Sequence, residues 1–526
     1  GDSILSMQIV SRANQEGLRL TPRQMFQHQT IAELSAVAGA AEAVRAEQGT
    51  VTGTVPLTPI QRWFFERELP DPDHYNLAVF LAVAEPLDPA RLELTVQRLA
   101  LQHDALRLRF RREESGWMQL LPDSAGPVPY ALLDLSALPE RLHRRAVEEA
   151  ATSAQRSLDL ARGPIFRVVS FDLGPGRAGR LLFVVHHLAV DGVSWRILLE
   201  DLETVYRQLG RGEAPRLPAK TTSFRSWARR LASHAFSPDV DREAVFWLAR
   251  AGEATEPLPA DFPGAGNGGE GSVRRVSLEL GEEATRALLQ EVPEVYGTRI
   301  NDVLLAALGE AFSRWTSRRL LRLDLESHGR EDLFEDVDLS RTVGWFTAEL
   351  PVLLNLEGVR GPGEALVAVK EQLRRIPAGG LGYGLLRYLR PGEEVAERLR
   401  ALPRPQVLFN YLGQLGDGRD GKGSLFTRAP EDGGPTVDPR GTRSHLLQID
   451  CSVADGRLRA EWAYSADRHR RETVEGLARG FFAAIETLIE HCRMPGAGAY
   501  TPSDFPDADL GDDDFASLMD RLSRAE

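Results

Sequence analysis

The clearest hydrophobic pattern in the chain begins at residue 181 and reads LLFVVHHLAVDGVSWRILLEDL. Residues 181–185 form a continuous apolar run, which is typical of a strand buried on both faces. A helix is predicted from Ser194 onward, with Ser194 as its N-cap, because apolar residues then recur at helical spacing. His186, His187 and Asp191 lie between the two elements. The pattern therefore predicts two histidines and an aspartate at a strand-to-helix turn.

Similar patterns alternate along most of the chain. Strands are predicted at residues 76–84, 165–171 and 320–325, and helices at residues 89–102, 140–160, 282–289, 298–316, 363–375 and 472–490. Proline and glycine interrupt the periodic segments at residues 210–224, where we expect a boundary between two lobes. A second, glycine-rich loop is predicted at residues 257–272. The alternation indicates an α/β fold with mixed sheets and helices packed on one side.

The composition of the chain mainly excludes certain classes of protein and of partner. A chain of 526 residues is long enough for two or three domains, and its 42% hydrophobic and 26% charged residues are typical of a soluble globular protein. No apolar run approaches the roughly 18 residues needed to span a membrane. The net charge of -13 argues against a nucleic-acid partner. The two cysteines, Cys451 and Cys492, lack metal-ligand spacing, which indicates a reduced cytoplasmic setting without a bound metal.

The two adjacent histidines cannot share one role, because neighbouring residues of a strand point to opposite faces. We expect one to face a cleft and the other to be held in the packing behind it. Their motif, HHxxxDG, resembles the signature of the condensation-domain superfamily of nonribosomal peptide synthetases, and HHLAVDGVSW resembles its epimerization branch. The resemblance implies two lobes similar to chloramphenicol acetyltransferase, arranged in a V shape. We assign residues 56–220 to the N-lobe and residues 221–495 to the C-lobe.

The first residues, GDSILSMQIV, resemble part of a second family. By itself, Ser3 before an amphipathic stretch predicts only a helix cap. The segment LRLTPRQMFQHQTIAELS that follows is similar to the last third of a peptidyl carrier domain, and GDS resembles its pantetheinylation motif. The resemblance implies a 4′-phosphopantetheine arm on Ser3, which would present the substrate as a thioester. Residues 1–43 are assigned to the C-terminal part of this carrier domain, and the polar, aperiodic residues 44–55 to a linker.

Further motifs of the epimerization branch follow in the family's order. Residues 326–331, ESHGRE, resemble the motif EGHGRE, with Ser327 in place of the usual glycine. This replacement leaves the turn geometry open, because serine is less free than glycine at positive φ. Peptide-bond-forming condensation domains do not usually have a glutamate at the position of Glu326, so Glu326 favours epimerization. Three later motifs are matched by RTVGWFT at 341–347, PAGGLGYG at 377–384 and FNYLGQ at 409–414.

The implied reaction, racemisation of an α-carbon next to a thioester, needs three kinds of group. A base must remove the proton, a second group must return one on the opposite face, and donors must hold the developing oxyanion. We expect His187 and Glu326 to be the acid/base pair across the lobe interface, with burial raising the pKa of Glu326. Asn410 and Tyr411 are candidates for hydrogen bonds to the oxyanion or the carbonyl.

Three further residues are expected to support this site rather than to react. His186 is assigned to the packing behind His187. Asp191 is expected to fix the loop by pairing with an arginine of the other lobe, with Arg330 as the first choice. Losing one member of such a pair would leave an unpaired buried charge.

Two alternatives to epimerization stay open from the sequence. A condensation domain would form an amide between two carrier-bound substrates, with His187 as the only catalytic side chain. A catalytically dead recruitment domain would only dock partners. The expected partners are a carrier and an adenylation domain in the same chain, a downstream condensation domain and an aminoacyl or peptidyl thioester, but no nucleic acid and no membrane. Residues 496–526 are predicted to be a linker or docking tail with a helix at 515–522.

Overall fold

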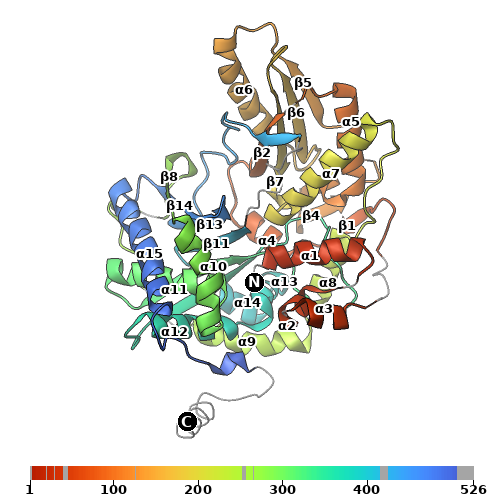
Figure 1. Ribbon diagram of the computed structural model, residues 1–526. Helices are drawn as coiled ribbons and strands as arrows, with labels where there is room; N and C mark the ends of the chain where they lie inside the picture. The colour runs from red at the N-terminus through yellow and green to blue at the C-terminus, as the bar shows by residue number, and fades with distance from the viewer. Residues whose placement is uncertain are drawn as a thin grey trace.

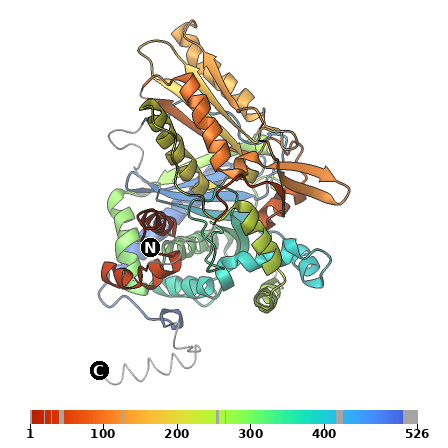
Figure 2. The ribbon, with the colours of Figure 1, turned by 90° about the vertical axis from the view of Figure 1, so that its right-hand side faces the viewer.

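The structure is a computed structural model, which describes residues 3–505 apart from residues 19, 29, 40–45, 84, 125, 252–255, 265 and 415–424. Two lobes, each built around a large sheet, lie one above the other (Figure 1, Figure 2). The predicted α/β class is confirmed, and both large sheets are mixed, with parallel and antiparallel strand pairs. Within the described residues, we find no helix with the length and apolar character that a membrane crossing requires.

The N-lobe sheet has five strands in the order β12-β2-β7-β6-β5. These strands are β2 Asn76–Val83, β5 Tyr130–Asp134, β6 Phe166–Asp172, β7 Gly179–His186 and β12 Phe426–Arg428. The lobe also contains α4 Pro59–Glu66, α5 Pro89–Gln102, α6 Glu140–Gln155, α7 Gly192–Gly210 and a small sheet of β1 Gly53–Val55, β4 Gly116–Leu121 and β3 Arg109–Glu113. The predicted apolar strand at 181–185 is confirmed as the centre of β7. Its five side chains are fully buried, because β7 lies between β2 and β6.

The C-lobe sheet has six strands in the order β10-β9-β11-β13-β14-β8. These strands are β8 Val273–Glu279, β9 Leu320–Ser327, β10 Ala348–Asn355, β11 Val407–Gln414, β13 Leu447–Ala454 and β14 Arg457–Ser465. One group of helices packs together beside the sheet, namely α10 Glu282–Tyr296, α11 Ile300–Thr316, α12 Pro362–Arg374 and α15 Arg471–Cys492 (Figure 1). A second group comprises α8 Phe224–His234, α9 Pro238–Ala251, α13 Leu381–Leu389 and α14 Glu394–Arg400. In that group α13 contacts β10, α9 and the N-lobe helix α4.

One segment of the second half of the chain crosses to the N-lobe. Strand β12 pairs antiparallel with β2 and completes the edge of the N-lobe sheet. Close to it, Arg180 of β7 donates to both carboxylate oxygens of Glu431, at 2.7 and 2.8 Å. The assignment of all residues 221–495 to the C-lobe is therefore wrong for this crossing segment. A strand three residues long that pairs with a distant strand leaves no periodic signal in the sequence.

Two further boundaries differ from the prediction. Residues 53–55 form β1, which pairs with β4, so the end of the predicted linker 44–55 belongs to the N-lobe. Helix α7 has Asp191 as its N-cap, because the Asp191 side chain accepts a hydrogen bond from the backbone N–H of Ser194 at 2.7 Å. The predicted N-cap, Ser194, lies instead in the first turn of the helix.

The two ends of the described chain pack on the C-lobe. The N-terminal fragment consists of α1 Ser3–Gln15, α2 Pro22–Gln27 and α3 Ile31–Val37 (Figure 1). Helix α1 contacts β11 and buries Val10, which gives three short helices the apolar contact that they cannot provide among themselves. In the predicted tail, Asp504 forms an ion pair with Lys370 of α12. The predicted tail helix at 515–522 lies outside the described residues.

Candidate active site

His186 is the last residue of β7 and is fully buried. Its Nε2 atom lies 2.8 Å from the carbonyl oxygen of Pro72, and its Nδ1 atom accepts the backbone N–H of Leu188 at 3.1 Å. Burial lowers the pKa of His186 to about 3, so the ring is neutral at physiological pH. Both ring nitrogens have hydrogen-bond partners within the N-lobe, which is the arrangement expected of a structural histidine.

His187 begins the short 3-10 turn after β7 and faces the junction between the lobes. Its Nδ1 atom lies 2.9 Å from the carbonyl oxygen of Val190, so we assign the ring proton to Nδ1 and the free lone pair to Nε2. The ring stacks on Tyr75 with centroids 5.7 Å apart, and it lies 4.2 Å from the ring of Trp345. Burial lowers the pKa of His187, which keeps the imidazole neutral and available as a base.

The loop after His187 is tied to the C-lobe by the expected ion pair between Asp191 and Arg330. Nη2 of Arg330 lies 3.1 and 3.2 Å from the two carboxylate oxygens of Asp191. The same guanidinium group donates to the hydroxyl oxygen of Ser194 at 3.0 Å and to the carbonyl oxygens of Leu339 and Thr342. Both charged side chains are buried, so the contact fixes the start of α7 against the other lobe.

Glu326 lies near the end of β9, in the middle of a row of polar side chains. The strand register places Glu349 of β10 and Asn410 of β11 directly opposite it, so these three side chains share one face of the sheet. Burial, with smaller contributions from the charges of Asp450 and Glu349, raises the pKa of Glu326 to about 8, while a hydrogen bond with Thr347 acts in the opposite direction. Both protonation states of this carboxyl group are therefore accessible near neutral pH.

His187 and Glu326 come to the same junction from different lobes. Tyr75, which stacks on His187, has a pKa raised chiefly by burial, and the charge of Glu326 acts in the same direction. The charge of Asp191, in the loop after His187, also contributes to the raised pKa of Glu326. Tyr75 therefore contacts His187 and lies within electrostatic range of Glu326, and both candidate residues are partly exposed.

Only one of the two predicted oxyanion donors faces Glu326. Asn410 is in register with Glu326 on one side and with Asp450 on the other. Tyr411 is paired with the buried Cys451, and consecutive residues of a strand point to opposite faces. The register therefore turns Tyr411 away from the face that carries Asn410, so of the two candidates only Asn410 shares a face of the sheet with Glu326.

The replacement of glycine by Ser327 does not disturb the turn. Ser327 is the last residue of β9 and is paired with Ala348, so its backbone is extended. The positive φ falls two residues later, on Gly329, at 64°. A Cβ atom on Gly329 would lie 1.8 Å from the carbonyl oxygen of Phe346, so this position requires glycine.

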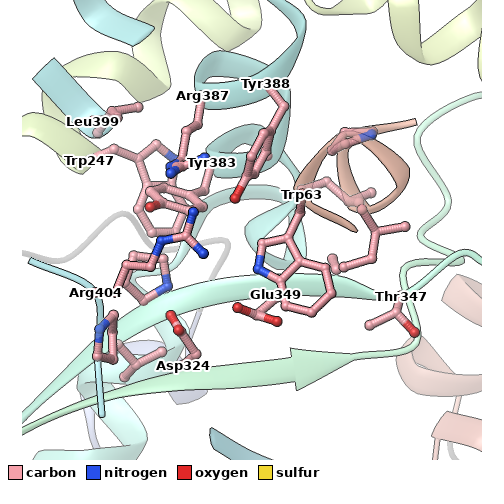
Figure 3. A pocket seen from close by; sticks show the side chains of 18 of the residues that line it. Trp63, Trp247, Asp324, Thr347, Glu349, Tyr383, Arg387, Tyr388, Leu399 and Arg404 are labelled. Atoms are coloured by element: carbon pink, nitrogen blue, oxygen red, sulfur yellow. The ribbon is translucent and has the colours of Figure 1, made fainter. Parts of the chain in front are cut away.

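A cavity opens beside this junction (Figure 3). Aromatic rings dominate its wall, from Trp63 of α4, Trp227 of α8, Trp247 of α9, Trp345 and, on α13, Tyr383 and Tyr388. The sequence motifs contained Trp345 and Tyr383 but gave no sign that the other rings join them. The wall is assembled from four helices and a loop, which only the packing of the lobes brings together.

Three ionisable residues form a second group, and two of them, Asp324 and Glu349, line this cavity. Asp324, Glu349 and His445 place one oxygen or nitrogen atom each within 4.8 Å of one another. Nε2 of His445 lies 2.8 Å from Asp324 Oδ2 and 3.9 Å from Glu349 Oε1. No sequence motif points to this group, because its residues are far apart in the chain.

The beginning of α1 suits the group that Ser3 is predicted to carry. Ser3 is the first residue of this 13-residue helix. The N-terminus of a helix favours a phosphate ester, because its unpaired N–H groups and its dipole point toward that end.

Comparison with known families agrees with this geometry. Residues 51–510 match the model of the condensation domain, and residues 1–38 match that of the phosphopantetheine attachment site. The chain belongs to the condensation-domain family. Its N-terminal part belongs to a carrier with a covalently attached 4′-phosphopantetheine, as the sequence predicted.

The curated relatives of this condensation-family chain are much longer proteins. It is 46% identical over 506 residues to one of the linear gramicidin synthase proteins of Brevibacillus parabrevis, which covers 96% of this chain and 10% of that protein. It is also 46% identical over 529 residues to chondramide synthase cmdD of Chondromyces crocatus, covering 99% of this chain and 13% of the relative. The chain therefore spans about a tenth of the length of these relatives.

Solved structures support the two-lobed fold. The crystal structure of the epimerization domain from the third module of tyrocidine synthetase B is 35% identical, with a TM-score of 0.77 over 85% of this chain and 98% of that one. The condensation domain from the monacolin K polyketide synthase MokA is 17% identical, with a TM-score of 0.66 over 85% of this chain and 99% of that one, and shows the fold alone. The condensation-family lobes resembling chloramphenicol acetyltransferase are thus confirmed.

Proposed function

We propose that the chain epimerizes, from L to D, the α-carbon of an aminoacyl or peptidyl thioester held on its carrier. The observation that carries this proposal is Glu326, a partly exposed carboxyl group whose pKa is raised by desolvation to about 8 and whose charge acts on Tyr75, the ring stacked on His187. Exchange of a proton on both faces of one carbon needs two such groups, whereas amide formation needs only one base. The 35% identity to an epimerization domain along 98% of that chain supports the same reaction.

In this proposal His187 and Glu326 act on opposite faces of the α-carbon. One of them removes the α-proton, and the other returns a proton from the opposite side. The side-chain amide of Asn410, in register with Glu326, donates a hydrogen bond to the oxygen on which negative charge develops. Well-placed acid/base groups of this kind typically contribute about 10²–10⁴-fold each.

The carrier fragment supplies the substrate. Ser3 is the proposed attachment residue of the 4′-phosphopantetheine, which, when bound, provides a long arm and a thioester carbonyl that acidifies the neighbouring α-hydrogen. An adenylation domain in the same synthetase would select the amino acid, and a downstream condensation domain would accept the D-configured product. We place the protein in the cytoplasm, in keeping with its two free cysteines.

Deuterium exchange tests the proposal directly. The full chain is loaded on Ser3 with an L-aminoacyl-pantetheine, and the α-deuterium content and chirality of the released amino acid are followed in heavy water. Glu326→Gln and His187→Ala should slow both by about 10²–10⁴-fold. Glu461→Gln, the same substitution in the partly exposed part of β14, is the matched control, and Ser3→Ala abolishes loading. Exchange at the parent's rate in both variants would refute the assignment.

Peptide-bond formation is the second candidate, because the family model that matches residues 51–510 is that of the condensation domain. The neutral ring of His187, with Nε2 free, also suits that reaction. A condensation assay with two differently loaded carriers distinguishes the two activities. Amide product that depends on His187 but not on Glu326, without α-proton exchange, would favour condensation.

A further inference from the structure

The carboxyl group of Glu326 is connected to the cavity through a second carboxyl group. Glu349 lies opposite Glu326 in the antiparallel pair of β9 and β10, so their side chains lie next to each other on one face of the sheet. Asp324, two residues before Glu326, is on the same face. Among the described residues, Asp324 and Glu349 line the cavity, whereas Glu326 does not (Figure 3). Glu349 therefore lies next to Glu326 and also borders the cavity.

Asp324, Glu349 and His445 form a bonded cluster that holds at least one proton. Oxygen atoms of Asp324 and Glu349 lie within 4.8 Å of each other, and two carboxyl groups this close favour one shared proton over two negative charges near neutral pH. His445 lies 2.8 Å from Asp324 and 3.9 Å from Glu349, measured from its Nε2 atom. Burial raises the pKa of both carboxyl groups and lowers that of His445. The cluster can therefore take up or release a proton near neutral pH.

The charges around the cluster are of both signs. Arg404, Arg387 and Arg322 lower the pKa of Asp324, and Arg67 and Arg404 act on Glu349 in the same way. The negative charge of Asp324 raises the pKa of Glu349, and the charge of Glu349 in turn raises that of Glu326. The charge of each carboxyl group thus affects the pKa of the next one, from Asp324 to Glu349 and from Glu349 to Glu326.

A two-base epimerization creates a need for such a connection. After one passage from L to D, one of the two groups has gained a proton and the other has lost one, so the site is set for the reverse reaction only. Before the next forward passage, Glu326 must exchange its proton with solvent. Glu326 is only partly exposed and does not line the cavity, whereas its neighbour Glu349 does, so Glu349 offers a route to the water of the cavity.

We propose that Glu349, together with Asp324 and His445, forms the path by which Glu326 exchanges protons with the water of the cavity. This inference rests on the proposed epimerization. In the resetting step the O–H bond of the Glu326 carboxylic acid breaks, and its proton passes to the carboxylate of Glu349. The proton that the cluster already holds then leaves to water, and the reverse sequence reloads Glu326. No oxidant, reductant or metal takes part, and Glu349 acts through Glu326 rather than on the substrate.

The isotope content of the regenerated starting epimer tests the path. The loaded full chain is placed in heavy water, in separate runs from the L and the D thioester, both with protium at the α-carbon. In the parent, Glu326 exchanges its proton with heavy water between one epimerization and the next. A molecule that returns to the starting configuration therefore carries deuterium at its α-carbon. In Glu349→Gln the proton taken up by Glu326 is trapped, and the reverse passage returns the original protium. The readout is a ratio, measured separately for each protein. It is the amount of α-deuterium in the regenerated starting epimer divided by the amount of interconversion between the epimers.

We expect this ratio to fall by at least about tenfold in Glu349→Gln for one of the two starting epimers, the one whose α-proton faces Glu326. Asp324→Asn should show the same asymmetry and serves as the test if Glu349→Gln does not fold. Glu461→Gln should match the parent, and a chelator should change nothing. A purely structural role of Glu349 would slow interconversion without altering the ratio.

Three outcomes would overturn the inference. The first is a parent-like ratio for both epimers in Glu349→Gln. The second is an equal fall for both epimers, which would indicate a general closure of the site. The third is a folded Glu349→Gln protein without any interconversion, because a group that only exchanges protons with solvent is not needed for the first passage. A parent without interconversion would instead refute the proposed function itself.

Discussion

Nη2 of Arg330, in the C-lobe, lies 3.1 and 3.2 Å from the two carboxylate oxygens of Asp191, in the N-lobe. Asp191 also caps α7 through the backbone N–H of Ser194 and accepts the backbone N–H of Phe346 at 3.2 Å. One carboxylate thus joins the loop after His187, the first turn of α7 and the segment that carries Trp345. The position of the candidate base depends on a buried charge pair between the lobes.

Replacing Asp191 by Asn should cost about 3–5 kcal/mol in the free energy of unfolding, because the buried guanidinium group of Arg330 loses its counter-charge. Urea unfolding at constant pH measures this loss. The exposed pair of Arg144 and Glu148 provides the control, and Arg144→Ala should change the free energy of unfolding by less than about 1 kcal/mol. Equal effects of the two substitutions would contradict the role given to Asp191.

The raised pKa of Glu326 predicts a stability that depends on pH. The ordinary pKa is 4.5 and the folded one about 8, so between these values the unfolded chain releases a proton that the folded protein keeps. The free energy of unfolding should therefore fall as the pH rises from 4.5 to 8. Glu326→Gln removes this contribution, and between pH 5 and pH 7.5 the variant should gain about 2–3 kcal/mol relative to the parent.

Urea unfolding of parent and Glu326→Gln at several pH values provides the measurement. Glu461→Gln should follow the parent at every pH. A constant difference between Glu326→Gln and the parent across the range would show that Glu326 ionises in the folded protein as it does in the unfolded chain.

Trp345 controls the environment of His187. The two ring centroids are 4.2 Å apart, and Trp345 comes from the C-lobe. Trp345→Ala admits water to the ring, so the lowered pKa of His187 should rise toward its ordinary value of 6.5. Titration of the His187 ring signals by nuclear magnetic resonance measures this change. Trp117→Ala, which removes a ring stacked on Phe65 in the N-lobe, should leave the titration of His187 unchanged.

The ion pair between Arg180 and Glu431 should hold the crossing strand β12 on the N-lobe. Its side chains are only 13% and 9% exposed, so Glu431→Gln leaves a poorly solvated arginine. Amide hydrogen exchange of β12 and of the paired end of β2 should become about tenfold faster, which corresponds to about 1.4 kcal/mol of local stability. The exposed Glu149→Gln is the control. Unchanged exchange in β12 after Glu431→Gln would show that strand pairing alone secures the crossing.

Much of the N-lobe motif could be predicted from local sequence. The buried strand β7, the two histidines at its end and the helix that follows are set by hydrophobic periodicity within about twenty residues. The expected pairing of Asp191 with an arginine of the other lobe, with Arg330 as the first choice, is also present. The predicted C-lobe helices agree with the structure to within a few residues at most ends, with α10 continuing to Tyr296.

The relationships that involve strand register could not be predicted. Glu349 lies beside Glu326 and Tyr411 turns away from Asn410 because β10, β9, β11 and β13 pair in one particular register, and a shift of one residue would exchange the two faces. The crossing of β12 and the aromatic wall of the cavity likewise depend on contacts between distant segments.

The amino-acid sequence by itself determined which residues are candidates for the chemistry, since a short motif holds its histidine or glutamate at a strand end through local backbone preferences. Only the tertiary structure decided which of them meet. Burial, pKa and neighbours are properties of the packed sheet, where hydrogen bonds between distant strands select one face for each side chain.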